Sequence, residues 1–184
     1  YPKAIWQGII SMRGAITILI LAWIISTVVS EMHTGEYLST LVAGNIHAGF
    51  LPVILFLLAG VMAFATGTSW GTFGIMLPIA AAMAVKVEPS LIIPCMSAVM
   101  AGAVFGDHCS PISDTTILSS TGAHCNHIDH VTSQFPYALT VAASAATGYL
   151  ALGMTGSAPL GFVVTGIVMV VLILILKDKK KATA

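Results

Sequence analysis

The feature that most restricts the fold of this chain is a series of apolar stretches, each close to the length that spans a lipid bilayer. A transmembrane helix takes about 20 residues, and the predicted spans lie at about 13–30, 90–121, 133–152 and 158–176, the second of them longer because a polar segment follows its apolar part. Only 8% of the residues are charged and the mean hydropathy is +0.97, whereas soluble domains carry roughly a quarter charged residues. The sequence therefore predicts an all-α integral membrane protein, a transmembrane helix bundle.

A further apolar stretch, 50–85, carries a polar interruption at 66–72. It is consistent either with one long broken helix or with a re-entrant hairpin that enters the membrane and returns. Basic residues stay on the cytoplasmic side, so the lysines at 177–181 place the C-terminus in the cytoplasm. With a hairpin, Lys3 and Arg13 also fall inside, and the charge rule therefore favours the hairpin.

Charge and cysteine usage exclude some classes of protein. The basic residues form no face that could hold nucleic acid, and three cysteines at irregular spacing do not suggest a disulfide framework. The chain begins at Tyr1 without a signal-peptide pattern. We therefore expect that an N-terminal part of the protein precedes it.

Small residues recur every fourth position in the span at 90–121, at Ala98, Gly102 and Gly106. This spacing places them on one helix face, where small side chains let two helices approach closely in lipid. The pattern predicts tight helix packing and says nothing about function.

Two segments, 66–72 and 106–116, break the apolar pattern with Gly, Ser and Thr, and the second adds two aspartates and a proline. A helix interrupted at membrane depth leaves backbone groups that only protein or a water-filled cavity can satisfy. Interrupted helices that face each other form the ion or substrate sites of many secondary transporters. Their carbonyl, hydroxyl and carboxylate oxygens would suit a small cation such as sodium.

Asp107 and Asp114 are the central candidates, because an ionised Asp at the bilayer centre costs about 2.5–3.5 kcal/mol on insertion scales. A carboxylate that binds Na+ when ionised and a proton otherwise makes exchange obligatory. The predicted ion-binding and proton-exchange residues are Asp107, Asp114, Ser110, Ser113, Thr115 and His108, with Na+ at the two aspartates, and the predicted hairpin tip contributes Thr66, Gly67, Thr68, Ser69 and Thr72. The alternative is an ordinary polar turn at the cytoplasmic surface, with His108 as a structural histidine.

The turn at 124–130 contains three histidines and Cys125. Such side chains bind zinc or copper, and imidazoles can sense pH, but no paired two-Cys, two-His spacing is present. A polar loop that starts the next helix is the simpler interpretation, and all three stay open.

The stretch Phe105–Ala123 strongly resembles the signature of the NhaC-type sodium/proton antiporter family. The stretches 34–38, 65–72 and 126–138 resemble the same family, and the matching stretches follow one another along the chain in the family's order. The resemblance implies that residues 1–184 are the C-terminal half of one antiporter domain in the bacterial inner membrane. It also implies two inverted halves, with 66–72 as a hairpin tip and 106–116 as an unwound helix.

The resemblance implies partners and cargo as well. The expected partners are the N-terminal half of the same protein and the lipid bilayer, while a homodimer stays open. No cofactor is expected, and the transported ions would be Na+ and H+. Family members also include sodium-coupled exchangers of malate and lactate, so an organic-anion exchanger is the alternative function.

Functions outside transport explain the sequence less well, and we do not expect an enzyme. An intramembrane aspartyl protease needs two carboxylates that face each other across two helices, whereas both aspartates here lie on one short segment. A structural membrane subunit would not explain two polar breaks with carboxylates.

Overall fold

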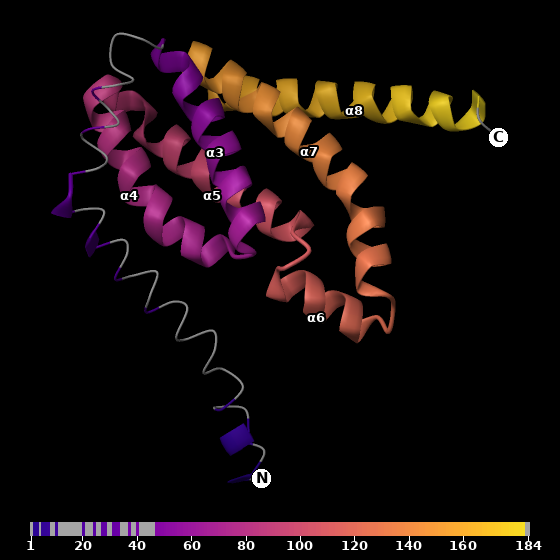
Figure 1. The fold of residues 1–184 in the computed structure, drawn as a ribbon. Helices are drawn as coiled ribbons and strands as arrows, with labels where there is room; N and C mark the ends of the chain where they lie inside the picture. The colour runs from indigo at the N-terminus through magenta and orange to yellow at the C-terminus, as the bar shows by residue number, and fades with distance from the viewer. Residues whose placement is uncertain are drawn as a thin grey trace.

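The computed structural model describes the backbone of residues 47–182 continuously, together with scattered positions between residues 2 and 40. The predicted span at 13–30 lies outside the continuously described residues. The described elements, shown in Figure 1, are η1 (Ala48–Phe50), α3 (Leu51–Thr66), α4 (Ser69–Val87), η2 (Pro89–Leu91), α5 (Ile92–Cys109), α6 (Asp114–Gly122), α7 (His127–Thr155) and α8 (Ala158–Ala182).

Five helices in the described part are long and apolar enough to cross a membrane, judged by length and composition. They are Ala48–Thr66, Ser69–Val87, Pro89–Cys109, His127–Thr155 and Ala158–Lys177. A helix of 19 residues is about 28 Å long, close to the hydrocarbon thickness of about 30 Å. The helical structure and these spans confirm the predicted all-α membrane fold class.

The stretch at 50–85 forms two helices rather than one broken helix. α3 and α4 run in opposite directions and contact each other (Figure 1). Gly67 ends α3 in the left-handed conformation, at φ 68°, which glycine adopts without steric cost. Thr68 is the N-cap of α4: its Oγ1 accepts a hydrogen bond of 3.3 Å from the backbone N–H of Gly71. The polar interruption is therefore a tight turn between antiparallel helices.

α3 and α5 pack so closely that the contact requires glycine. A Cβ built on Gly102 would overlap the carbonyl oxygen of Phe56, and one on Gly106 would overlap that of Gly60. The close approach expected from the spacing of Ala98, Gly102 and Gly106 is confirmed. The buried core of this part of the bundle includes Leu55, Ala59, Val99 and Ala103 from α3 and α5, and Met76, Ala80 and Met83 from α4.

α7 packs across α3 and α5. The ring of Phe56 packs against those of Phe105 and Tyr149, with centroid distances of 6.2 and 5.5 Å. The helix that contains the predicted span at 133–152 is α7, which begins at His127. The side chain of Asn126 caps it by accepting hydrogen bonds from the N–H groups of the second and third helical residues.

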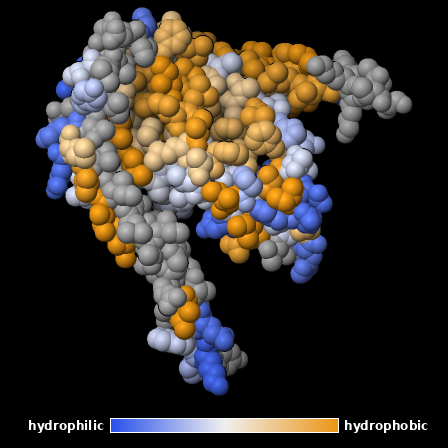
Figure 2. Space-filling model, viewed as in Figure 1, coloured by the Kyte–Doolittle hydropathy of each residue, from blue (hydrophilic) through white to orange (hydrophobic). Residues whose placement is uncertain are grey.

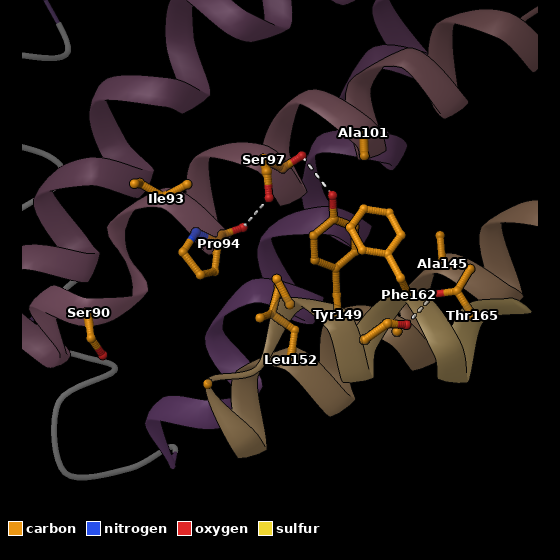
Figure 3. Close-up of a pocket in the computed structure, with 14 residues that line it drawn as sticks. Ser90, Ile93, Pro94, Ser97, Ala101, Ala145, Tyr149, Leu152, Phe162 and Thr165 are labelled. Atoms are coloured by element: carbon orange, nitrogen blue, oxygen red, sulfur yellow. Dashed lines mark hydrogen bonds between the residues drawn. The ribbon is translucent and has the colours of Figure 1, made fainter.

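α8 extends away from the other helices, with α7 as its main contact (Figure 1). Apolar side chains cover most of the helical body in Figure 2, while polar ones gather at the end where α6 meets α7. A cavity of about 620 Å³ lies between α5, α7 and α8, lined largely by apolar side chains (Figure 3). Part-buried hydrogen bonds lie along its wall: the hydroxyl of Tyr149 donates to the carbonyl of Ser97 at 3.0 Å, and that of Ser97 donates to the carbonyl of Pro94 at 2.9 Å.

The α3–α5 contact predicts that Gly102→Ala destabilises the bundle. The added Cβ meets backbone atoms of Phe56, which cannot rotate away, and overpacking of this kind costs about 1–3 kcal/mol. Gly166→Ala is the matched control, since a Cβ there meets nothing within 4 Å. The free energies of unfolding in mixed detergent micelles should separate the two variants, and equal values would contradict the tight contact.

Candidate functional site

The carboxylate of Asp107 is the centre of the polar structure inside the bundle. Asp107 lies in the last turn of α5 and is 7% exposed. Its Oδ1 accepts a hydrogen bond of 2.6 Å from the hydroxyl of Ser113, and its Oδ2 accepts one of 2.9 Å from the hydroxyl of Ser69. Ser69 is the first residue of α4 and Ser113 lies just before α6. One carboxylate thus joins three segments of the chain.

The helix break that follows Asp107 is residues 110–113, called the break below. It is shorter than the predicted unwound segment 106–116, because α5 continues to Cys109 and α6 begins at Asp114. Pro111 explains its position: proline has no N–H to continue a helix and disfavours helical conformation in the preceding residue. Ser110 accordingly adopts φ −75°, ψ 131°.

The break is fixed against the end of α3 by a buried serine. The hydroxyl of Ser110 donates to the carbonyl of Phe64 at 2.8 Å and accepts from the N–H of Ile112 at 3.3 Å. The carbonyl of Phe64 belongs to the last turn of α3, where the helix itself offers no donor. The serine therefore satisfies backbone groups of two interrupted helices at once.

The turn between α3 and α4 touches the break directly. A Cβ built on Gly67 would lie 2.8 Å from the carbonyl oxygen of Ile112. Together with the Ser69–Asp107 hydrogen bond, this contact brings the two polar interruptions of the sequence into one place.

Of the predicted hairpin-tip side chains, Ser69 is the one that reaches the carboxylate. The hydroxyl of Thr66 donates to the carbonyl of Met62 at 2.9 Å, and that of the buried Thr72 donates to the carbonyl of Thr68 at 2.9 Å. These hydroxyls are therefore engaged with their own helices, and Thr68 serves as a helix cap.

The structure separates the two predicted aspartates. Asp114 is exposed on the first turn of α6, and its Oδ1 accepts from the N–H of Thr115 at 2.8 Å. The hydroxyl of Thr115 lies 2.6 Å from that of Ser113. Ser113 uses its single hydroxyl hydrogen on Asp107, so Thr115 must be the donor. Thr115, Ser113 and Asp107 form one chain of hydrogen bonds, and His108 is exposed beside it.

The oxygen atoms around Asp107 form a ligand set that suits a hard cation. Carboxylate, hydroxyl and carbonyl oxygens from Asp107, Ser69, Ser113 and Phe64 lie at or beside the contact between the break and the turn. Hard cations take oxygen ligands of these kinds. In the part of the chain that the structure describes, no group of three or more His, Cys, Asp or Glu could hold a metal, so the zinc or copper interpretation of 124–130 gains no support.

Two side chains of α7 that we did not expect at the site contact this region. The Nε2 atom of His127 is 2.7 Å from the carbonyl oxygen of Pro111, and the amide Nε2 of Gln134 donates to the carbonyl of His108. Both residues lie in the stretch 126–138, whose resemblance to the antiporter signature was the available signal.

A buried carboxylate shared by a helix break and a helical turn, within a bundle of apolar helices, is typical of a secondary transporter. The comparison with protein families is more specific. The chain belongs to the Na+/H+ antiporter family, whose model matches residues 1–154. The predicted family is thereby confirmed.

Three relatives show the range of this similarity. The chain is 63% identical over 179 residues to an uncharacterized protein of Haemophilus influenzae, covering 97% of this chain and 34% of the relative. It is 30% identical over 135 residues to the malate-2H(+)/Na(+)-lactate antiporter of Bacillus subtilis, covering 70% of this chain and 27% of the relative. It is 32% identical over 105 residues to an uncharacterized Na(+)/H(+) antiporter of Haemophilus influenzae, covering 57% of this chain and 22% of the relative.

The chain thus spans between about a fifth and a third of the length of these relatives. No solved structure matches it.

Comparing alanine substitutions at Gly67 and Gly156 separates two costs: that of the left-handed backbone conformation and that of the contact between Gly67 and the break. Gly67 and Gly156 both have φ 68°, but a Cβ on Gly156 meets nothing within 4 Å. Each change to alanine should cost about 1–2 kcal/mol for the left-handed conformation. Gly67→Ala should cost on the order of 1–3 kcal/mol more, because the Cβ overlaps the backbone of Ile112. Unfolding in mixed micelles measures the difference, and equal costs would show that the contact is unimportant.

Proposed function

We propose that the protein is a secondary active transporter that exchanges Na+ for H+ across the bacterial inner membrane, with Asp107 as the exchanging group. The observation that carries this proposal is the buried Asp107 carboxylate, bonded to Ser69 and Ser113 where the turn between α3 and α4 meets the break. Membership of the Na+/H+ antiporter family supports it.

The geometry explains how one group could serve both ions. An ionised carboxylate at membrane depth is costly unless a counter-charge compensates it, so Asp107 is best occupied either by a proton or by Na+. The hydroxyls of Ser69 and Ser113 donate to the free carboxylate. A hydroxyl also has lone pairs, so the same two side chains can turn to coordinate Na+. Occupation by one ion excludes the other, which makes the exchange obligatory.

The surrounding residues complete the proposal. Ser110 fixes the break and Thr115 supports Ser113, while the exposed Asp114 would attract Na+ toward Asp107 and the exposed His108 would relay protons. The hairpin is proposed to be re-entrant, with the N-terminal half of the same protein supplying an inverted counterpart and further Na+ ligands. The C-terminal lysines favour a cytoplasmic C-terminus.

A sodium-coupled organic-anion exchanger is the second candidate, because of the similarity to the malate-2H(+)/Na(+)-lactate antiporter of Bacillus subtilis. Backbone N–H groups at the start of α4 and α6 could hold a carboxylate. Recognition of a dianion usually also uses Arg or Lys, and neither 66–72 nor 106–116 contains one. The structure therefore supports cation exchange better.

The test uses the full-length protein in vesicles with a trapped pH dye. A Na+ pulse alone should move protons, and Asp107→Asn should abolish this movement, because an amide can neither release a proton nor supply a charge to Na+. Asp129→Asn, a change at an exposed acid in the first turn of α7, is the matched control and should leave the rate unchanged.

Two outcomes would count against this assignment. Proton movement only in the presence of malate or lactate would favour the anion exchanger. Undiminished Na+-driven movement in Asp107→Asn would remove Asp107 from the exchange step.

A further inference from the structure

Two side chains on one face of α7 donate to backbone carbonyls at the end of α5 and in the break. His127 and Gln134 are seven residues apart, which places them on the same side of the helix. His127 reaches Pro111, with Nε2 and the carbonyl oxygen 2.7 Å apart, and Gln134 reaches the carbonyl of His108. These two residues are called the α7 clamp below.

Each carbonyl in question lacks a regular helical partner. His108 lies in the last turn of α5, where carbonyls have no intrahelical donor, and Thr116 adds a second hydrogen bond to it at 3.4 Å. Pro111 lies outside any helix. Unpaired backbone carbonyls inside a protein are costly, so the clamp supplies what the interrupted helix lost.

The donor arrangement at His127 follows from the identity of its partners. A carbonyl oxygen can only accept, so Nε2 must carry the hydrogen. Nδ1 lies 3.1 Å from the hydroxyl of Ser120 on α6, and the single hydrogen of that hydroxyl can point either to Nδ1 or to the carbonyl of Ile117 at 2.9 Å. The ring is therefore held from α6 while it holds the break, and the contact to Pro111 needs an N–H at Nε2 but no positive charge.

We propose that the α7 clamp positions the break so that Ser113 stays on the Asp107 carboxylate, and that His127 is thereby a positioning residue for Na+ binding. Ser113 is two residues from Pro111, and its hydroxyl makes the 2.6 Å hydrogen bond to Asp107. Release of the Pro111 carbonyl would let this hydroxyl move away. The proposal rests on the proposed function in one respect only, the use of Asp107 as the Na+ ligand.

A matched pair of variants tests the clamp. The amide nitrogen of Gln can occupy the place of His Nε2, whereas that of Asn corresponds to Nδ1 and falls short of Pro111. Loss of a supporting partner of this kind typically lowers metal affinity about 10–100-fold. His127→Asn should therefore raise the KM for Na+ in the vesicle assay about tenfold, with the amount of folded protein unchanged, and His127→Gln should restore it.

The control is His124→Asn, in the same turn. His124 is exposed and has φ 53°, a conformation that asparagine tolerates, so its KM should equal that of the parent. Equal KM values for the Asn and Gln variants at position 127 would overturn the proposal. A fall in maximal rate or folded protein alone, without a change in KM, would indicate a merely structural role and would also overturn it.

A second readout does not depend on transport. Ser113 is fully buried, so in a Ser113→Cys background a membrane-permeant maleimide should label position 113 slowly, as measured by mass spectrometry of its peptide. Adding His127→Asn should accelerate the labelling and adding His127→Gln should not. Equal labelling rates would overturn the clamp even where Na+ drives proton movement. Differing labelling rates would keep the clamp even if the parent protein, with Ser113 intact, showed no Na+-driven proton movement, and that absence of movement would refute the proposed function.

Discussion

The hydrogen bonds that Asp107 accepts from Ser69 and Ser113 are the interaction on which the polar interior of this bundle depends. They connect the end of α5, the start of α4 and the residue before α6 through a single buried side chain. Charge or polarity at that depth is tolerated only when partners satisfy it. The surrounding serines and carbonyls are therefore best understood as the environment that makes this carboxylate possible.

The packing of α3 against α5 places that carboxylate. Gly102 and Gly106 let α5 lie directly on the backbone of α3 at Phe56 and Gly60. The next turn of each helix then brings Asp107 beside the turn at Gly67, and Ser110 beside the carbonyl of Phe64. Without the glycines, side chains would separate the two helices and the hydroxyl–carboxylate distances could not be kept. The face of α5 that carries Gly102 and Gly106 therefore determines both the close packing against α3 and the position of the polar site.

Much of this could be predicted from the sequence because the determinants are local. Gly67 and Pro111 mark the two interruptions through backbone conformation alone, and the four-residue spacing of small residues predicts the close helix pair. The sequence could not distinguish Asp107 from Asp114. Seven residues apart in an unbroken helix, they would share a face, whereas the break re-aims the chain and leaves one buried and the other exposed.

The role of His127 was hidden for a related reason. Its partner Pro111 is 16 residues away, and only the path of the chain through α6 brings them together.

The presence of one buried carboxylate also limits the stoichiometry of the proposed exchange. One carboxylate that holds either one proton or one Na+ exchanges them one for one and moves no net charge. A transporter that moved more protons per Na+ would need a second titrating group, and Asp114, across the break from Asp107, would be open to ligands from the rest of the protein.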